Sequence, residues 1–597
     1  MLKRPRRDEE DGVVLVTVLL LSMVMLIIVA GTMAYALGSQ PISRRDQDWN
    51  AALAAAEAGL DDYLFRLNEN DQYYLYSATS LPPDGNQAFT TWVSVPDSGS
   101  ASVTCVASAD SNIPCFRYSV DTANLTAQGA IIITSTGRSR NVTRSVQATL
   151  RRKAFIDYLY FTDYETKDPA AYGTGDFYTS TQAQTYCAKR YYQGRDVSGR
   201  DDHVAMGTAT DSDASGAYCV DINFASGDVV NGPLHSNDAI LICGSPTFNG
   251  AVSTSWQGAG TPVQRWRANT SCTNTPNFTQ AGDPKYADPL TMPPSNVSIK
   301  ADADGALGGT GCLYTGPTAI VLNSTGTMDV TSPFTKSTNA NCLGTGKPLP
   351  TNGVIYVQNV PSTATDPNYT SGCPYSVAPV GTPVTTTPTR AHPLGYPQQN
   401  DITTYGCRNG DVFLRGTLKG RLTIAADNNI DVIGSVTYQS GTGGSDLLGL
   451  VANNYVEIYH PVRTDGSTTN CDGGNVNGGC NLRIAWPGQT SLQATALRLP
   501  TVQAAILSVV HSFRVQNYSY GDNNPSSVTM TITINGAIAQ RYRGIVGTIN
   551  TTGYTKNYNY DNRLKYQSPP HFLTQIAAAW QIVTWIEQKA ALAWNAP

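Results

Sequence analysis

The chain carries little charge for its length. Asp, Glu, Lys and Arg together make up 14% of its 597 residues, and the net charge is -5. Such a balance predicts neither a basic surface for nucleic acid nor a strongly acidic surface. We therefore expect no nucleic-acid partner.

Closely spaced metal ligands are also missing. The six histidines show no HxH or HExxH spacing, and no two of the 12 cysteines form a CxxC pair. Zinc sites in proteins usually depend on such spacings, so the sequence predicts no metal site, and it offers no motif for a cofactor. His235 is the most suggestive histidine because Ser236, Asn237 and Asp238 follow it. We interpret it as a turn residue that makes hydrogen bonds.

A pair of catalytic carboxylates is not apparent either. Glycoside hydrolysis typically needs two carboxylates held about 5–9.5 Å apart. Asp228 and Asp411 open expected strands, whereas Asp238, Asp431 and Glu457 stand singly. These residues predict no catalytic site, and we expect that the protein is not an enzyme.

One long apolar run breaks this otherwise polar pattern. Residues 13–37 contain no charge, and a bilayer core of about 30 Å needs roughly 20 helical residues, so the run predicts a membrane segment. The apolar core of a cleaved secretory signal is shorter, about 7–15 residues. Four basic residues precede the run and two follow it closely: Lys3, Arg4, Arg6 and Arg7, then Arg44 and Arg45. This bias favours a cytoplasmic N-terminus and an exported remainder.

The start of the run resembles a known family. A short basic leader ends at Gly12 and the apolar residues begin at Val13. This junction resembles the class III signal of type IV pilins and pseudopilins, which prepilin peptidase cuts after the glycine. The later stretch Ala-Ala-Glu-Ala-Gly, residues 55–59, is similar to that of PilX-like minor pilins. The resemblance implies cleavage between Gly12 and Val13.

The same resemblance implies a domain order and a set of partners. Residues 1–12 would be the leader, 13–37 the transmembrane and filament helix, 38–70 its exported continuation, and 71–165 an antiparallel pilin-like head. Partners would be other pilins and minor pilins, bound through the N-terminal helix, together with prepilin peptidase and the inner-membrane assembly platform.

Thr17 departs from the pattern of most pilins, which carry a glutamate at the fifth mature position. By resemblance, that glutamate pairs with the free amine of the subunit assembled before it, which offsets the cost of burying both charges. A first subunit has no such amine to neutralise. Thr17 therefore suits a subunit at the filament tip, although a neutral residue is also what any membrane anchor needs.

The helix is expected to continue beyond the membrane. Apolar residues recur in steps of three and four, which keeps them on one face of a helix. The stripe consists of Trp49, Leu53, Ala56, Leu60, Tyr63 and Leu67. Pro41, beside Gly38 and Ser39, predicts a break or a kink between two helical pieces.

The remaining chain predicts a mostly β structure, which makes the fold class α+β. Residues 130–136 and 143–150 are expected to form two strands of the head, joined by a turn at 137–139. From residue 166 to 570, short β-branched runs end in Asn-Gly, Asn-Asn or a lone Gly, which favours a parallel β-helix; a β-sandwich is the alternative. Residues 571–597 are expected to form a helix that caps this domain.

The cysteines are even in number and all lie beyond residue 100, as expected of an exported domain in an oxidising compartment. Pairing neighbours in sequence order would close each long loop locally, although sequence alone does not fix the connectivity. The expected disulfides are Cys105–Cys115, Cys187–Cys219, Cys243–Cys272, Cys312–Cys342, Cys373–Cys407 and Cys471–Cys480.

These observations favour a minor pilin of a type IV pilus, anchored by one membrane helix and then displayed on the cell surface. It would act in assembly priming or adhesion. Tyrosine-rich stretches at 517–524 and 553–572 favour contact with a surface glycan or protein. A tip pseudopilin of a type II secretion-like system is one alternative, and a membrane-tethered β-helix enzyme acting on glycans is another.

Overall fold

The computed structural model divides into two compact units, one of residues 1–122, 131–150 and 580–597, the other of residues 123–130 and 151–579. We refer to them as the head unit and the large unit. The residues that the structure describes are 11–70, 72–95, 105, 113–125, 129–152, 154–173, 176–192, 202–203, 219–372, 394, 407–463, 478–481, 500–521, 530–548, 552–573 and 580–588.

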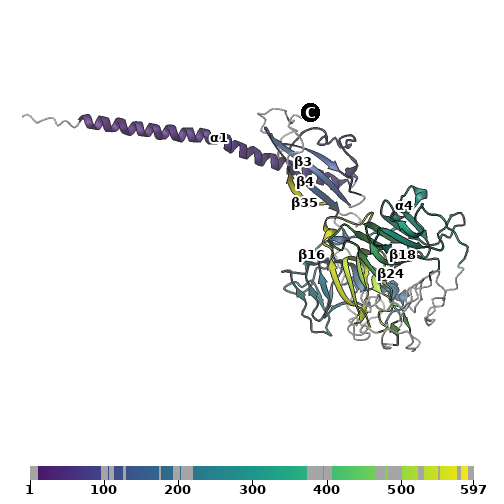
Figure 1. Ribbon diagram of the computed structural model, residues 1–597. Coiled ribbons are helices and arrows are strands. Elements are labelled where there is room, and N and C mark those ends of the chain that lie inside the picture. The colour runs from purple at the N-terminus through teal and green to yellow at the C-terminus, as the bar shows by residue number, and fades with distance from the viewer. Residues whose placement is uncertain are drawn as a thin grey trace, which may run out of the picture. The chain divides into compact units, whose positions relative to one another are not determined.

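The head unit begins with one long helix, α1, which runs from Asp11 to Glu69 (Figure 1). Pro41 lies inside it, so of the expected break or kink at this proline, the break into two separate helices is wrong. Proline removes one backbone hydrogen bond, and here the apolar run before it and the alanine-rich run after it both favour helix strongly enough to continue through it.

The C-terminal part of α1 packs on a sheet. Ala56, Leu60, Tyr63 and Leu67 of the expected stripe are at most 2% exposed, whereas Trp49 is 47% exposed. The small residues Ala52 and Ala55 are equally buried. The buried face therefore contains alanines in addition to the residues of the expected stripe.

Five strands form the sheet of the head unit, in the order β1-β2-β3-β4-β35. Their bounds are β1 Val93–Ser94, β2 Cys115–Asp121, β3 Ala130–Ser139, β4 Val142–Arg152 and β35 Trp580–Gln588. β2 pairs antiparallel with both β1 and β3. The two expected strands are confirmed as β3 and β4, with the turn moved to Arg140, which has a φ of 48°.

β35 corrects the expectation of a C-terminal capping helix. Residues 580–588 form a strand next to β4 in the head unit. Their sequence is rich in β-branched and aromatic residues, which suit a strand: Trp580, Ile582, Val583, Thr584, Trp585 and Ile586. Pairing with the otherwise open edge of β4 outweighs the local helical pattern.

The head also ends earlier than the expected boundary at residue 165. β5, Tyr160–Lys167, pairs in parallel with β10, Leu234–Ser236, and with β31, Thr531–Arg543. All three strands belong to the large unit. An early segment of the chain is thus inserted between strands that come much later.

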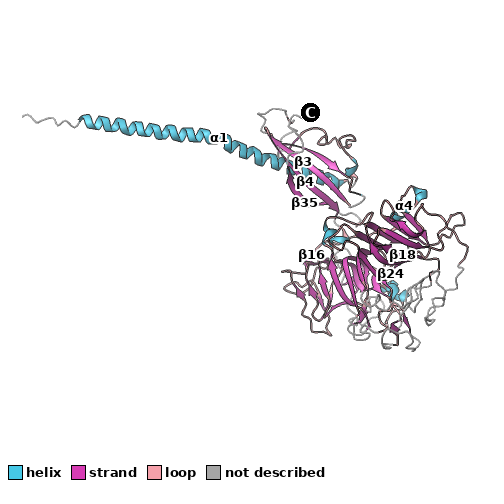
Figure 2. Ribbon diagram, in the orientation of Figure 1, coloured by secondary structure: helices cyan, strands magenta, loops and turns pink. Residues whose placement is uncertain are grey.

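The large unit consists mostly of strands (Figure 2), and its longest ladder pairs in parallel throughout. In spatial order its strands are β17 Cys312–Thr315, β21 Val354–Gln358, β23 Arg421–Ala426, β25 Leu447–Ala452, β29 Thr501–Ser508, β31, β5, β10, β13 Val252–Thr254 and β16 Lys285–Tyr286.

The register of this ladder stacks apolar residues in line. Ile424, Leu450, Ile506 and Ile538 are successive partners on β23, β25, β29 and β31, and all are fully buried. The stack continues through Tyr160 on β5. Burial of such a row, at about 25 cal/mol per Å² of apolar surface, is the main stabilising contribution of the unit.

Other ladders run beside the first and are also parallel. One joins β18 Thr318–Asn323, β22 Val412–Leu418, β24 Ile430–Tyr438, β26 Val456–Ile458 and β30 Phe513–Val515. Another joins β31 to β34 Thr555–Tyr560, β9 Val229–Asn231, β12 Thr247–Phe248 and β15 Asn277–Phe278. An antiparallel sandwich would not give these pairings.

Four of the expected disulfides are confirmed: Cys105–Cys115, Cys187–Cys219, Cys243–Cys272 and Cys312–Cys342. Cys407 and Cys480 are disulfide-bonded as well. Their expected partners, Cys373 and Cys471, lie outside the described residues. Each confirmed bond joins neighbours in sequence and closes a loop locally.

Candidate functional site

The N-terminal part of α1 presents apolar side chains that nothing in the described chain covers. Its large apolar residues between Val14 and Leu37 are 54–81% exposed. Among the described helices, α1 is the one that has the length and composition to cross a membrane. This surface is compatible with a single membrane anchor.

The residues expected to guide processing lie at the start of this helix. Gly12 and Val13 are helical, one and two residues after the first residue of α1. Thr17 lies one turn further, and its Oγ1 donates a hydrogen bond to the carbonyl oxygen of Val14 at 2.9 Å. The threonine hydroxyl therefore has a partner inside the helix and adds no charge to the apolar surface.

The Ala-Ala-Glu-Ala-Gly stretch lets α1 pack closely on the sheet, a role that the sequence alone does not indicate. A Cβ atom at Gly59 would lie 2.4 Å from Oγ of Ser135 and 2.7 Å from the ring of Phe116. On the facing strand, a Cβ at Gly137 would lie 2.0 Å from the carbonyl oxygen of Ala52. α1 thus crosses β2 and β3 at a distance that only small residues allow.

Polar contacts fix the helix at this crossing. The carboxylate of Asp62 accepts hydrogen bonds from Nε of Arg66 at 3.0 Å and from the hydroxyl of Tyr118 at 3.1 Å. Nearer the membrane-like segment, Asp48 pairs with Nη1 of Arg140 at 2.9 Å. These contacts set the rotation of α1 and hence the direction in which its exposed apolar half leaves the head.

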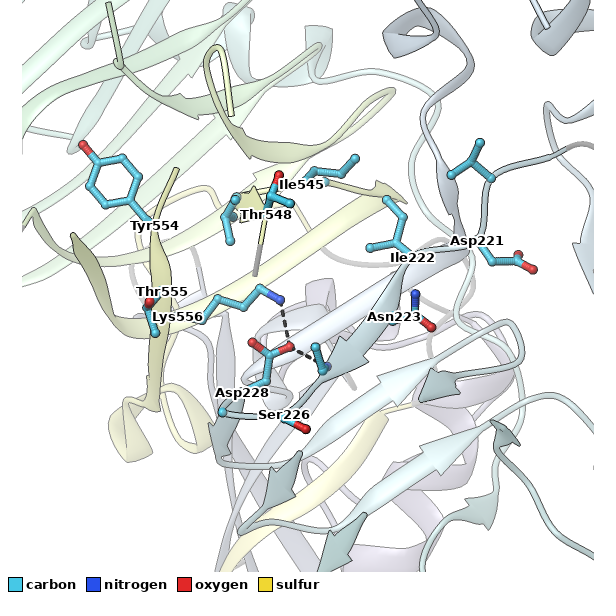
Figure 3. A pocket seen from close by; sticks show the side chains of 16 residues that line it. Asp221, Ile222, Asn223, Ser226, Asp228, Ile545, Thr548, Tyr554, Thr555 and Lys556 are labelled. Atoms are coloured by element: carbon cyan, nitrogen blue, oxygen red, sulfur yellow. Dashed lines mark hydrogen bonds and ion pairs between the residues drawn. The ribbon is translucent and has the colours of Figure 1, made fainter. Parts of the chain in front are cut away.

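The large unit contains an open groove of about 340 Å³ (Figure 3). Its walls come from residues 220–228, 544–548 and 554–556. Lys556 reaches across toward Asp228, whose Oδ2 lies 2.9 Å from Nζ and also accepts a hydrogen bond from the backbone of Ala225. Asp221 pairs with Arg267 at 2.5 Å.

The described lining of the groove includes polar side chains. No histidine, cysteine or glutamate lines it, and both of its aspartates are engaged by cations. Hydroxyl and amide groups such as Ser226, Asn223 and Thr548 suit a polar ligand.

The acids that stand singly in the sequence are brought together in the core. Asp431 on β24 is the register partner of Glu457 on β26, which is the partner of Arg514 on β30. Arg514 donates a hydrogen bond to Glu457 at 2.8 Å, and Asp411 lies close by. These acids stand singly in the sequence because the cross-strand register that brings Asp431 next to Glu457 cannot be seen there.

Burial governs the charge of this cluster. Asp411, Asp431 and Glu457 are fully buried. Burial, outweighing hydrogen bonds from Asn429 and Asn428, raises the pKa of Asp411 to about 7. Burial and the nearby Glu457 and Asp411 raise the pKa of Asp431 well above its ordinary value. None of these three carboxyls is exposed to solvent in this structure.

His235 lies on strand β10 and not in a turn. It is fully buried, with Nδ1 2.9 Å from Oγ of Ser253 and Nε2 3.2 Å from Oδ1 of Asn237. The interpretation of a hydrogen-bonding histidine is confirmed, although its location differs. Across the part of the chain that the structure describes, no three His, Cys, Asp or Glu residues are grouped so that they could hold a metal ion.

Comparisons with known proteins identify no family for this chain. No family model and no curated protein sequence matches it. Among solved structures it is similar to the competence-associated pilin ComZ from Thermus thermophilus, with 13% sequence identity, 91% of this chain and 97% of that chain covered, and a TM-score of 0.25. Similarity at that TM-score carries no argument about fold or function.

Proposed function

We propose that the chain is a minor pilin of a type IV pilus, processed between Gly12 and Val13 and assembled through α1. The large unit would then be displayed at the cell surface, for assembly priming or adhesion. Other pilins and minor pilins would contact the exposed half of α1. Prepilin peptidase and the inner-membrane assembly platform would act on the subunit before it enters the filament.

The observation that carries this proposal is the division of α1 into two halves with opposite surroundings. Residues from Val14 to Leu37 expose apolar side chains, whereas Ala52 to Leu67 pack on the antiparallel sheet of the head. Apolar surface of that extent is unfavourable in water and needs a lipid or protein environment. A subunit that moves from membrane to filament meets both.

We further propose that the protein does not act as an enzyme. The large unit has parallel ladders like those of a β-helix, a fold that also supports glycan-active enzymes. Its clustered carboxyls, Asp411, Asp431 and Glu457, are however fully buried, and the acids of the open groove are paired with cations. These features favour display over catalysis.

Replacement of Gly12 tests the pilin proposal. In the native host, Gly12→Leu should block cleavage, so that the leader stays attached with its basic residues on the cytoplasmic side. Mass spectrometry of the membrane fraction should then find the uncleaved N-terminus, and sheared filaments should lack the subunit.

Gly31→Leu is the matched control, because it adds the same side chain to the same helix away from the junction. No heavy atom lies within 4 Å of the position a Cβ would take at Gly31. Processing should be normal in this variant. Normal cleavage and normal filament content in Gly12→Leu would refute the proposed function.

A further inference from the structure

Three strand ladders of the large unit end within residues 267–286. β14, Arg267–Ala268, is the last strand of a short ladder with β11 Leu241–Cys243 and β8 Asn223–Ala225, while β15 and β16 are the last strands of two longer ladders. Among the described residues, each of the three pairs with a strand on one side only. No described strand therefore continues these three ladders beyond them.

A second open pocket, of about 740 Å³, lies in the chain segments that lead into these last strands. It is formed by a loop within residues 256–266 and by the turn Gly282–Pro284. An antiparallel bridge between Ala259 and Gln264 closes the loop on itself. The loop that carries the pocket is therefore an ordered hairpin.

Two tryptophans give the pocket its apolar walls. Trp256 is 7% exposed and Trp266 is partly buried against the main core, so both indoles are held in place by packing. Val263, on the hairpin, is 55% exposed. Fixed indole and aliphatic surfaces of this kind suit the C–H face of a sugar ring, which brings apolar area with little flexibility.

Arg265 lies between these walls without a partner. It makes no hydrogen bond or ion pair with any residue that the structure describes, and its Nε is buried. Arg267, two residues later, also has a buried Nε, but it pairs with Asp221 and stacks 3.7 Å above the ring of Tyr192. Arg265 is thus a cation held at a pocket wall and available to an anionic group.

Asp283, in the turn Gly282–Pro284, supplies an acceptor to the same pocket. Its Oδ2 accepts a hydrogen bond from the backbone nitrogen of Val252 at 3.1 Å. Its Oδ1 is buried and has no hydrogen-bond partner among the described residues. A buried acceptor without a partner is costly, and a donor such as a ligand hydroxyl would relieve that cost.

We propose that this pocket binds an acidic saccharide, such as a uronic acid residue of a surface polysaccharide. One such residue matches all three features of the pocket. The face of its ring can pack on the indoles, its hydroxyls can donate hydrogen bonds to Asp283, and its carboxylate can accept two hydrogen bonds from Arg265. A neutral sugar would leave Arg265 unpaired, and an acidic peptide would leave the indoles and Asp283 without complementary groups. The inference deepens the proposed display function and rests on it.

Binding of a tetragalacturonate to the full-length chain in detergent tests the pocket. Isothermal titration calorimetry should detect binding of the tetragalacturonate. The neutral tetrasaccharide of the same sugar should bind at least about tenfold more weakly, because the pair between the sugar carboxylate and Arg265 is lost. A tetraglutamate peptide should bind no better than the neutral sugar. Arg265→Gln should remove the preference for the acidic sugar, and Arg265→Lys should keep part of it.

Lys285→Gln is the matched control, since Lys285 is an exposed cation on β16 that does not line the pocket. Lys285→Gln should leave binding of the tetragalacturonate unchanged. The melting temperature of Arg265→Gln should equal that of the native protein, which shows that this variant still folds. Equal binding of neutral sugar or peptide, no binding at all, or unchanged binding in Arg265→Gln would each overturn the inference. Filament content is measured separately, so this failure is distinguishable from failure of the proposed function.

Discussion

At the scale of single residues, the buried carboxyls of the large unit make the free energy of unfolding depend on pH. The pKa of Asp411 is raised from 3.8 to about 7 in the folded protein. A carboxyl that holds its proton more firmly in the folded state favours folding at low pH. Its contribution to the free energy of unfolding therefore falls as the pH rises from about 4 to about 7.

Asp411→Asn imitates the protonated carboxyl and should remove this dependence. The amide can keep the acceptor that Asn428 and the backbone of Asn429 contact. We expect the variant to gain stability relative to the native protein as the pH rises through this window, by on the order of 1 kcal/mol per pH unit. Thermal unfolding followed by circular dichroism at pH 5 and pH 7.5 measures the difference.

Asp446 provides the control with the opposite sign. Burial alone would raise the pKa of Asp446, but hydrogen bonds from Ser440 and Gly420 and the nearby Arg563 lower it below its ordinary value. Asp446→Asn should thus be less stable than the native protein at neutral pH and approach it in acid. A parallel response of the two variants to pH would contradict the assignment for Asp411.

Thr17 tests the position of the subunit in the filament. A glutamate there would place a carboxylate in the hydrocarbon, at a cost of about 2.5–3.5 kcal/mol on insertion scales, unless an amine pairs with it. In a first subunit no amine is available, so Thr17→Glu should lower the number of filaments per cell without changing processing. Counting filaments by electron microscopy decides this, and an unchanged or higher number would reject the tip position.

At the scale of elements, the crossing of α1 over the sheet depends on glycine at two facing positions. Gly59→Ala would bring a methyl group against Ser135 and Phe116, and the rigid ring can yield only by moving the helix. We expect a loss of about 1–3 kcal/mol in the free energy of unfolding of the head unit. Faster hydrogen exchange of the amides in β2 and β3 would report it.

Gly38→Ala is the matched change on the same helix. No heavy atom lies within 4 Å of the Cβ position at Gly38. Alanine favours helix over glycine by about 1 kcal/mol, so this variant should be neutral or slightly more stable. Equal exchange rates in the two variants would show that the helix does not pack as closely as described.

Elements fixed by local sequence could be predicted, and those fixed by distant partners could not. The apolar helix and the hairpin of β3 and β4 follow from patterns within about 30 residues. The four confirmed disulfides join cysteines that are neighbours in sequence, although the sequence alone does not fix their pairing. The strand at 580–588 and the pairing of Asp431 with Glu457 depend on which edge or rung lies beside them. The second open pocket likewise combines two segments that the sequence gives no reason to join.

At the scale of the whole molecule, late segments complete early ones in both units. β35 adds to the sheet that begins with β1, and β5 lies between β31 and β10 in the long ladder. Contacts between segments so far apart in sequence form slowly, because the loops between them must close first. Neither unit therefore reaches its full structure until the C-terminal part of the chain is available.

Truncation after Pro570 tests this dependence in the head unit. Without β35, Arg144 loses its ion pair with Glu587, and Asn68 loses two hydrogen bonds to the backbone of Trp580. The edge of β4 is then open, and an unpaired edge promotes association. We expect the truncated chain to aggregate in size-exclusion chromatography and its head to be cut rapidly in limited proteolysis.

Glu587→Gln separates the strand from its ion pair. A partly exposed ion pair contributes at most about 1 kcal/mol, so this variant should stay monomeric and protease-resistant. A monomeric truncated chain with an intact head would show that β35 is dispensable. The other outcome is that the truncated chain aggregates while Glu587→Gln stays monomeric. The head would then need the C-terminal strand to be complete, and only subunits whose large unit has already been synthesised in full could assemble.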